Sequence, residues 1–308
     1  MKDVDCQVAS EIVIFGALGD LSRRKLLPSL YQLELAGLLA EGTRIVGVAR
    51  QDITLAQFIQ QISDGLENFI SEDLDTSVVE KFLARIVYQQ LDLKNVDAYS
   101  QLAKNIQSQQ TPRVYYFSTA PALYGDISDG LKTSNLIKDN DRVVMEKPIG
   151  HCLESSKVIN DQVSRYFNEN QIYRIDHYLG KETVLNLLVL RFANSLFTNN
   201  WDRNSIDHIQ ISVAESVGIE GRWGFYDDAG QMRDMVQNHL LQILSLLAME
   251  PPADLSADSI RDEKPQAIKA LKPITRQNVK DSTVRGQYAD GYLNGVAVPG
   301  YLNEEGAQ

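Results

Sequence analysis

The fold is decided at residues 12–21, which read IVIFGALGDL. The first residues of this stretch are apolar and mostly β-branched, which is typical of a buried strand. Gly16 and Gly19 then form a turn, and a helical pattern follows. Such a turn brings backbone N–H groups and a helix N-terminus to a bound pyrophosphate. Because the spacing is not the common G-x-G-x-x-G, an ordinary strand-to-helix turn is the competing interpretation.

Strands and helices alternate through the first half of the chain. The short apolar segments predicted as strands are Glu11–Phe15, Arg44–Ala49, Ile86–Gln90, Arg113–Phe117 and Arg142–Met145. Helical patterns lie between and after them, at Leu26–Leu39, Leu55–Phe69, Val78–Leu83 and Ser155–Phe167. This alternation predicts an α/β fold with a Rossmann-type doubly wound parallel sheet.

The pattern changes near Gln171, and we place a domain boundary at Arg174. Residues 1–174 are predicted to form the Rossmann domain, and residues 175–308 a second domain of the α+β class. The elements predicted in the second domain are the helices Gly180–Leu190 and Gln231–Met249 and, between them, the strand Ile206–Glu215.

Composition limits the kinds of partner. The chain has 308 residues and a formal net charge of -11, which would repel nucleic acid and anionic lipid, so neither is expected to bind. Cys6 and Cys152 fit a reducing compartment, and no Cys or His spacing predicts a metal site. The N-terminus lacks the apolar segment of a signal peptide, and no stretch is long enough to span a membrane. We therefore expect a cytoplasmic protein.

Arg50 ends the second predicted strand, in the sequence Gly47-Val48-Ala49-Arg50. NAD-binding folds usually have an Asp or Glu here, which binds the ribose 2′-hydroxyl. A guanidinium fits a 2′-phosphate instead. The reversed charge favours NADP as the cofactor, although an arginine that closes a strand is also common on protein surfaces.

Further motifs occur in the order known from one enzyme family. A G-x-x-G-D-L signature ends in Asp20 and Leu21 and is followed by RKLLP at residues 24–28. The later motifs are Glu146-Lys147-Pro148, RIDHYLGKE at residues 174–182, EGR at residues 220–222 and RDMVQNHLL at residues 233–241. From about Ile12 to its last residue, the chain resembles the glucose-6-phosphate dehydrogenases.

The resemblance implies an activity and a coenzyme. These enzymes oxidise C1 of glucose 6-phosphate to 6-phosphogluconolactone and transfer hydride to NADP, in the first step of the oxidative pentose phosphate pathway. The turn residues Gly16, Gly19, Asp20 and Leu21, together with Arg50, would then contact the cofactor. We place Asp92 and Leu93, which close the third predicted strand, near its adenosine side.

His239 is implied as the general base and Asp176 as the carboxylate that orients it. Oxidation of a sugar hemiacetal requires a base for the C1 hydroxyl proton, and a carboxylate fixes the tautomer of a histidine base. Asp234 and Asn238 lie on the same predicted helix as His239, so one end of this apolar helix is polar. In the absence of these neighbours, a lone histidine on an apolar helix is more often a core residue.

The remaining substrate contacts also follow from the resemblance. It assigns the 6-phosphate to His177, Tyr178 and Lys181, and the sugar hydroxyls to Glu215 and Asp234. From the residues alone, a solvated helix terminus is an equally reasonable interpretation of His177 and Lys181. Without the resemblance, Glu215 and Asp234 are interpreted as solvent-facing carboxylates.

Lys147 follows the carboxyl end of a predicted parallel strand, which is where ligands bind in doubly wound sheets. We therefore expect Lys147 to contact both the cofactor and the sugar and to take part in catalysis. The resemblance implies that the Lys147–Pro148 peptide bond is cis.

Two other interpretations remain open. One is a protein that binds NADP without turnover, and the other is a sugar or inositol dehydrogenase with a Glu-Lys-Pro motif, which the Arg174–Glu182 block disfavours. In the resembled family, the segment like Val298–Gln308 lies in the middle of the second domain, and further strands of an antiparallel sheet and the dimer interface follow it. We therefore expect an incomplete second domain, and a homo-oligomer only for the full-length family member.

Overall fold

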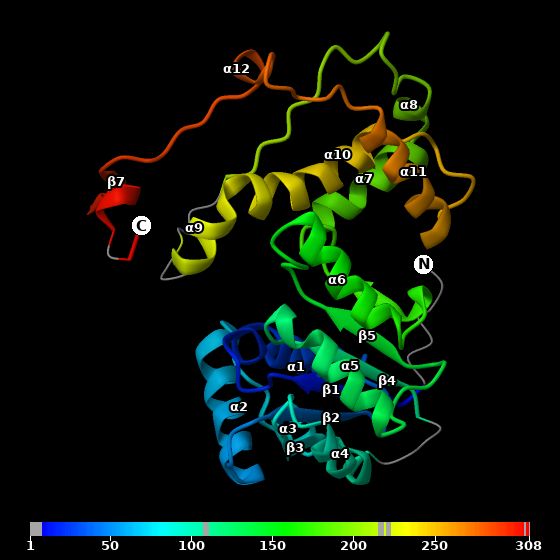
Figure 1. Ribbon diagram of the computed structural model, residues 1–308, viewed down its shortest axis with the longest axis vertical. Helices are drawn as coiled ribbons and strands as arrows, with labels where there is room; N and C mark the ends of the chain where they lie inside the picture. The colour runs from blue at the N-terminus through cyan, green and yellow to red at the C-terminus, as the bar shows by residue number, and fades with distance from the viewer. Residues whose placement is uncertain (1–7, 107–110, 215–218, 220–222, 305, 308) are drawn as a thin grey trace. The chain divides into compact units, whose positions relative to one another are not determined.

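The structure is a computed structural model that describes residues 8–106, 111–214, 219, 223–304 and 306–307. The chain divides into two compact units, Met1–Ile175 and Asp176–Gln308 (Figure 1).

The first unit is built on a six-stranded sheet with the strand order β3-β2-β1-β4-β5-β6, in which all neighbours are parallel. The strands are β1 (Glu11–Phe15), β2 (Arg44–Ala49), β3 (Ile86–Gln90), β4 (Arg113–Phe117), β5 (Arg142–Met145) and β6 (Ile172–Arg174). The predicted fold class is confirmed, and β1 to β5 have the predicted bounds. β1 lies between β2 and β4, so the strand order changes direction beside β1. Ligands of doubly wound sheets bind at the carboxyl ends of the strands at such a point.

Helices cover both faces of this sheet (Figure 1). On one face, Ile14 of β1 packs with residues of α1 (Leu27–Leu35), α2 (Leu55–Phe69) and α3 (Thr76–Leu83). On the other face, Val13 and Phe15 of β1 pack with residues of α4 (Tyr99–Asn105), α5 (Tyr124–Thr133) and α6 (Leu153–Ser164). Successive residues of a strand point to opposite faces, so the continuous apolar run of β1 serves two cores at once.

Shorter helical segments join these elements. They are the π-helical η1 (Ser22–Leu26) before α1 and the 3-10 helices η2 (Val96–Ala98), η3 (Pro121–Leu123) and η4 (Glu169–Gln171). Side chains also fix where helices begin. Thr54 and Gln57 form a capping box at the start of α2, and Asp75 accepts hydrogen bonds from the first backbone N–H groups of α3.

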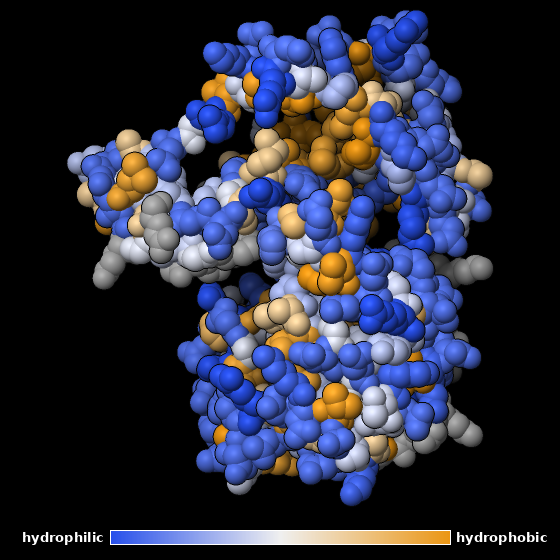
Figure 2. Space-filling view, viewed as in Figure 1, coloured by the Kyte–Doolittle hydropathy of each residue, from blue (hydrophilic) through white to orange (hydrophobic). Residues whose placement is uncertain are grey.

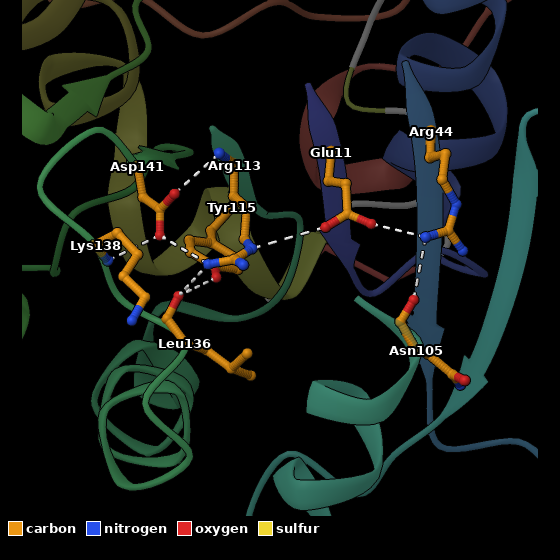
Figure 3. A network of polar contacts seen from close by, with 8 residues as sticks. All are labelled: Glu11, Arg44, Asn105, Arg113, Tyr115, Leu136, Lys138 and Asp141. Atoms are coloured by element: carbon orange, nitrogen blue, oxygen red, sulfur yellow. Dashed lines mark hydrogen bonds and ion pairs between the residues drawn. The ribbon is translucent and has the colours of Figure 1, made fainter. Parts of the chain in front are cut away.

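A chain of charged side chains crosses the amino-terminal edge of the sheet (Figure 3). Arg44 Nη1 lies 2.8 Å from Glu11 Oε1, Arg113 Nε lies 3.7 Å from Glu11 Oε2, and Arg113 Nη1 lies 3.4 Å from Asp141 Oδ2. Burial raises the pKa of Asp141, although hydrogen bonds from Lys138 and Arg113 and the charge of Arg113 act in the opposite direction. Because the charges alternate in sign, each buried charge has an opposite charge as its neighbour.

The second unit is mainly helical in the part that is described. Its helices are α7 (Glu182–Phe192), α8 (Ser195–Thr198), α9 (Trp223–Gln231), the π-helical η5 (Met232–Leu240), α10 (Leu241–Ala248), α11 (Ala257–Lys269), α12 (Val279–Ser282) and the 3-10 helix η6 (Tyr301–Asn303). A hairpin of β7 (Gly291–Leu293) and β8 (Val296–Val298) is antiparallel. The core joins Tyr178, α7 and α10, and Ile260 and Ala267 of α11 pack against it.

The strand predicted at Ile206–Glu215 is wrong for its described part, residues 206–214, which has no regular secondary structure. A strand persists only where a neighbour accepts and donates its backbone hydrogen bonds. The strands described in this unit, β7 and β8, pair with each other. The described residues of the unit therefore offer residues 206–214 no neighbouring strand with which to pair.

The second unit exposes several large apolar side chains on its surface. Figure 2 shows apolar side chains gathered in a hollow at the top of the view. In the second unit, Leu185 and Val189 of α7 are 52% and 59% exposed, and Leu196 of α8 is 76% exposed. Exposed apolar groups in this number are typical of a surface that a further segment or partner covers.

Candidate functional site

The glycine turn joins β1 to a helix that begins at Asp20. Gly16 has a φ of +86°, and a Cβ added there would lie 2.2 Å from the carbonyl oxygen of Ser118, so both the backbone conformation and the space require glycine. Gly16 and Ala17 both donate their backbone N–H groups to the carbonyl oxygen of Val48. The turn is thus held against β2 and β4, with the helix N-terminus directly behind it.

A hydroxyl group beside this turn lacks a partner. Ser22 donates its hydroxyl to the carbonyl oxygen of Gly16, at 3.0 Å, and lies 3.0 Å from the hydroxyl of Ser118. The next residue, Thr119, has a buried Oγ1 that makes no hydrogen bond to any described residue. Buried hydroxyl groups are normally paired, so this one is an open polar position at the carboxyl end of β4.

The other predicted cofactor contacts follow the carboxyl ends of neighbouring strands. Arg50 is exposed and comes directly after β2. Asp92 and Leu93 come after β3, but both have structural contacts: Asp92 Oδ1 accepts the backbone N–H of Lys94 at 3.1 Å, and Leu93 packs against a core. A role for Asp92 and Leu93 in cofactor binding stays a prediction.

Lys147 lies just past the carboxyl end of β5 and is half-buried. The Lys147–Pro148 bond is cis, as expected. The preceding Glu146 is buried and accepts a short hydrogen bond from the hydroxyl of Tyr116 on β4. Burial, followed by the Glu146 carboxylate, raises the pKa of Tyr116, so this hydroxyl remains a donor. The backbone that carries Lys147 is thereby tied to the neighbouring strand.

In the second unit, Asp176 and His239 lie in direct contact. Asp176 Oδ1 lies 2.7 Å from His239 Nδ1 and accepts the backbone N–H of Tyr178 at 2.9 Å. His239 is 2% exposed. Its ring stacks on the ring of Tyr178, with centroids 4.2 Å apart and planes at 22°. Because an ionised carboxylate only accepts hydrogen bonds, Nδ1 carries the proton and Nε2 is the basic nitrogen.

A π-helix positions the polar end of the predicted helix. The segment predicted as one helix, Gln231–Met249, is π-helical over Met232–Leu240 and becomes α-helical at Leu241. A π-helix bonds residues five apart, and such turns often occur at functional sites. Asp234 and His239, which are five apart, therefore share a face that an α-helix would not give them.

The predicted phosphate contacts lie in the turn before α7. His177 and Lys181 are exposed, whereas Tyr178 is 8% exposed and belongs to the core of the unit. Lys181 Nζ lies 3.8 Å from the centroid of the Tyr178 ring. One tyrosine ring thus contacts both Lys181 and His239.

Glu215 lies outside the described residues, as does Cys6. Cys152 caps the start of α6, and His208 pairs with Asp207, so both have structural contacts. Within the described part of the chain, no group of His, Cys, Asp and Glu is arranged to hold a metal ion, and no helix is long and apolar enough to cross a bilayer.

Sequence reasoning missed Lys264, a half-buried residue of α11, whose pKa is lowered by burial, while the negative charge of Asp176 acts in the opposite direction. The helix itself was not foreseen, because Pro265 lies inside it and prolines usually end helices. The signal that was present is the apolar face of α11, with Ile260 and Ala267 at helical spacing around Lys264.

Comparison with known proteins gives the same family for both parts of the chain. Residues 13–186 match the family description "Glucose-6-phosphate dehydrogenase, NAD binding domain", and residues 188–308 match "Glucose-6-phosphate dehydrogenase, C-terminal domain". Glucose-6-phosphate 1-dehydrogenase of Dickeya dadantii is 56% identical over 299 residues, which are 97% of this chain and 61% of that protein. The Rhizobium meliloti enzyme is 46% identical over 96% of this chain and 60% of that protein.

Solved structures agree with the sequence relatives. Glucose-6-phosphate 1-dehydrogenase from Mycobacterium avium matches 88% of this chain and 58% of its own, with 39% identity and a TM-score of 0.82. A glucose-6-phosphate dehydrogenase in complex with its substrate glucose-6-phosphate matches 98% of this chain and 63% of its own, with 34% identity and a TM-score of 0.87. The chain spans about three fifths of the length of the curated relatives named above. With both family descriptions matched along its length, the chain belongs to the glucose-6-phosphate dehydrogenase family.

Proposed function

We propose that this protein oxidises C1 of glucose 6-phosphate to 6-phosphogluconolactone and passes the hydride to NADP. The observation that carries this proposal is the 2.7 Å contact between buried His239 Nδ1 and Asp176 Oδ1. A neutral imidazole whose tautomer is fixed by a carboxylate is the base that oxidation of a hemiacetal requires. Membership of the family supplies the substrate and the pathway, which is the oxidative pentose phosphate pathway.

The residues around the glycine turn fit NADP. The turn and the helix N-terminus offer backbone N–H groups to a pyrophosphate. Thr119 Oγ1, which is buried without a partner among the described residues, is a further donor or acceptor at the same edge. Exposed Arg50 at the end of β2 suits a 2′-phosphate. The carboxylate that usually binds the ribose at this position would repel that phosphate. When bound, the nicotinamide accepts the hydride.

The chain's own residues would supply the proton chemistry. His239 Nε2 would take the proton of the C1 hydroxyl, and Asp176 would stabilise the imidazolium that forms. Asp176 holds its own position because its Oδ1 also accepts the backbone N–H of Tyr178. Tyr178 fixes the plane of the imidazole by stacking on it.

Six residues are proposed to contact the substrate. We assign the 6-phosphate to His177, Tyr178 and Lys181, and a sugar hydroxyl to Asp234. We keep Glu215, which lies outside the described residues, as a second carboxylate for the sugar. Lys147 is proposed to contact both the sugar and the cofactor, which its position after β5 supports.

We further propose a cytoplasmic location and, for the full-length family member, a homo-oligomer. The net charge of -11 supports the absence of nucleic acid and anionic membrane among the partners.

The proposal is tested by following NADPH absorbance with glucose 6-phosphate, glucose and inositol as parallel substrates. The 308-residue chain and a version extended by the C-terminal part of the Dickeya relative are both assayed. We expect the extended version to turn over glucose 6-phosphate and not the other two. NADP binding without turnover in both versions would favour a binding protein, and turnover of inositol would move the protein to another substrate class.

A further inference from the structure

Two side chains of β3 hold the backbone at Arg50, directly after β2. The hydroxyl group of Tyr88 donates a hydrogen bond to the carbonyl oxygen of Gln51 at 2.6 Å. The side-chain amide of Gln90 donates to the carbonyl oxygen of Arg50 at 3.4 Å. The last register pair of the two strands is Ala49 with Gln90. The two side-chain hydrogen bonds therefore continue the contact between the strands where the register of backbone pairs ends.

The backbone hydrogen bonds just before Arg50 add to this support. The carbonyl oxygen of Val48 accepts two backbone N–H groups of the glycine turn, at 2.9 and 3.1 Å, and that of Ala49 accepts the N–H of Leu91 at 2.8 Å. The carbonyl oxygens of residues 48–51 thus all accept hydrogen bonds. A side chain on a backbone fixed in this way loses less conformational freedom when it binds an anion.

The ring of Tyr88 is itself fixed by packing. Its centroid lies 4.9 Å from that of Phe58 on α2, with the planes at 45°. Phe58 is 1% exposed, and a Cβ added at Gly47 of β2 would lie 2.4 Å from its ring. A glycine inside a strand often marks such a close approach. Gly47 therefore leaves room for the ring that packs on Tyr88.

The hydroxyl group of Tyr88 is a donor at neutral pH. Burial, followed by the negative charge of Asp52, raises the pKa of Tyr88 above its ordinary value of 10.0. A phenol has one proton to donate, and the carbonyl oxygen of Gln51 accepts it. The direction of this hydrogen bond is therefore fixed, with the tyrosine donating and the backbone accepting.

We propose that Tyr88 is a positioning residue for coenzyme selectivity: by holding the backbone at Gln51, it directs the guanidinium of Arg50 toward the 2′-phosphate of NADP. Gln90 supports the same segment through its longer hydrogen bond. NAD has a hydroxyl group in place of this phosphate, so it gains little from a well-placed guanidinium. The inference rests on the proposed function, in which Arg50 binds the 2′-phosphate.

The test compares the Kd values of NADP and NAD, measured by fluorescence titration. Tyr88→Phe keeps the ring that packs on Phe58 and removes only the hydroxyl group. We expect it to raise the Kd for NADP by roughly two- to tenfold, as the loss of one hydrogen bond would, and to leave the Kd for NAD unchanged. The matched control Tyr173→Phe, which alters an exposed tyrosine of β6, should change neither value.

A double variant shows whether Tyr88 acts through Arg50. With Arg50→Ala already present, Tyr88→Phe should not raise the Kd for NADP further, because the guanidinium that it positions is gone. A merely structural role of Tyr88 would weaken the binding of both coenzymes and would persist in the absence of Arg50. Circular dichroism checks that each variant is folded, and no turnover is required.

Three results would overturn the proposal while Arg50→Ala remains selective for NADP. They are an unchanged Kd for NADP in Tyr88→Phe, an equal loss for both coenzymes, and a loss that persists in full in the double variant. If Arg50→Ala instead weakens NADP and NAD equally, the assignment of Arg50 is wrong, and the proposal for Tyr88 is wrong with it. The behaviour of Arg50→Ala thus distinguishes the two failures.

Discussion

Arg50 stands at the carboxyl end of β2, one strand away from the glycine turn, and its side chain is exposed. We expect Arg50→Ala to weaken NADP binding by about 1.5–3 kcal/mol, and to leave NAD binding nearly unchanged, because the guanidinium would serve only the 2′-phosphate. Fluorescence titration with both coenzymes measures this. The control is Lys132→Ala, an exposed cation on α5, and an equal loss for both coenzymes would refute the assignment of Arg50.

The second prediction at the scale of a single residue concerns the effect of His239 on kcat. In an active version of the chain, His239→Ala should lower kcat by a factor of roughly 10² to 10⁴, while the KM for glucose 6-phosphate changes little. The lost group is a base that acts in the transition state and not a binding contact. Steady-state kinetics of His239→Ala are compared with those of His208→Ala, which changes an exposed histidine that is paired with Asp207. Similar losses of kcat in both variants would remove His239 from the mechanism.

The sequence could predict individual residues only where a motif names them. Asp176 and His239 are 63 residues apart, and nothing in their spacing indicates the 2.7 Å contact; the family motifs brought them together. Lys264 belongs to no motif that was used, and a proline beside it hid the helix that presents it. Contacts that tertiary packing creates between elements leave no local pattern.

At the scale of elements, Glu34 ties α1 to α3. Its carboxylate is 2.7 Å from Lys81 Nζ and 2.7 Å from Arg85 Nε, and its side chain is 1% exposed. Burial alone would raise the pKa of Glu34, but hydrogen bonds from Lys81 and Arg85 lower it below 4.5. A carboxyl whose pKa is depressed in the fold stabilises it above the unfolded pKa and loses that effect as pH falls through the folded pKa.

We therefore expect Glu34→Gln to destabilise the first unit by about 2–4 kcal/mol at neutral pH, because buried Arg85 loses its anion. The difference between variant and native protein should begin to shrink as the pH falls below 4.5, where the carboxyl of the unfolded chain takes up a proton, and should vanish below the depressed pKa of the folded carboxyl. Urea unfolding at several pH values measures both effects. Glu80→Gln on the exposed side of α3 is the control, and a penalty that persists in acid would contradict the role of the charge.

The sequence predicted elements well where a short, largely apolar run lies between turns. β1 to β5 are apolar runs bounded by turns, and their predicted bounds are those of the structure. β6 was missed because it has three residues, of which Tyr173 and Arg174 are exposed. Residues 206–214 have a strand-like pattern without a partner, and the π-turn around His239 has no recognised sequence pattern, so neither could be found by periodicity alone.

At the scale of the whole molecule, the two units differ in how completely they bury their apolar residues. The first unit has two cores on either side of a sheet, whereas α7 and α8 of the second expose Leu185, Val189 and Leu196. The Dickeya relative is aligned over 61% of its own length. We expect residues 1–308 alone to keep a folded first unit, to aggregate through the second and to turn over slowly, since exposed apolar patches associate.

We test this by measuring light scattering and kcat/KM for residues 1–308 and for the version extended with the relative's C-terminal part. A soluble dimer of the short chain with a comparable kcat/KM would show that these apolar faces need no cover. A first unit that fails to fold in the short chain would contradict the expectation that this unit folds independently of the second.

The alternating charges from Arg44 through Glu11 and Arg113 to Asp141 make the sheet cooperative. They link β2, β1, β4 and the residue before β5. Separating any neighbouring pair of these strands would leave a buried charge without its oppositely charged partner. The four strands should therefore open together. Their backbone amides would exchange for deuterium with one common opening free energy, while β6, outside the chain of charges, would exchange sooner. Distinct opening energies for β1 and β4 would mean that these strands part independently despite the charges that join them.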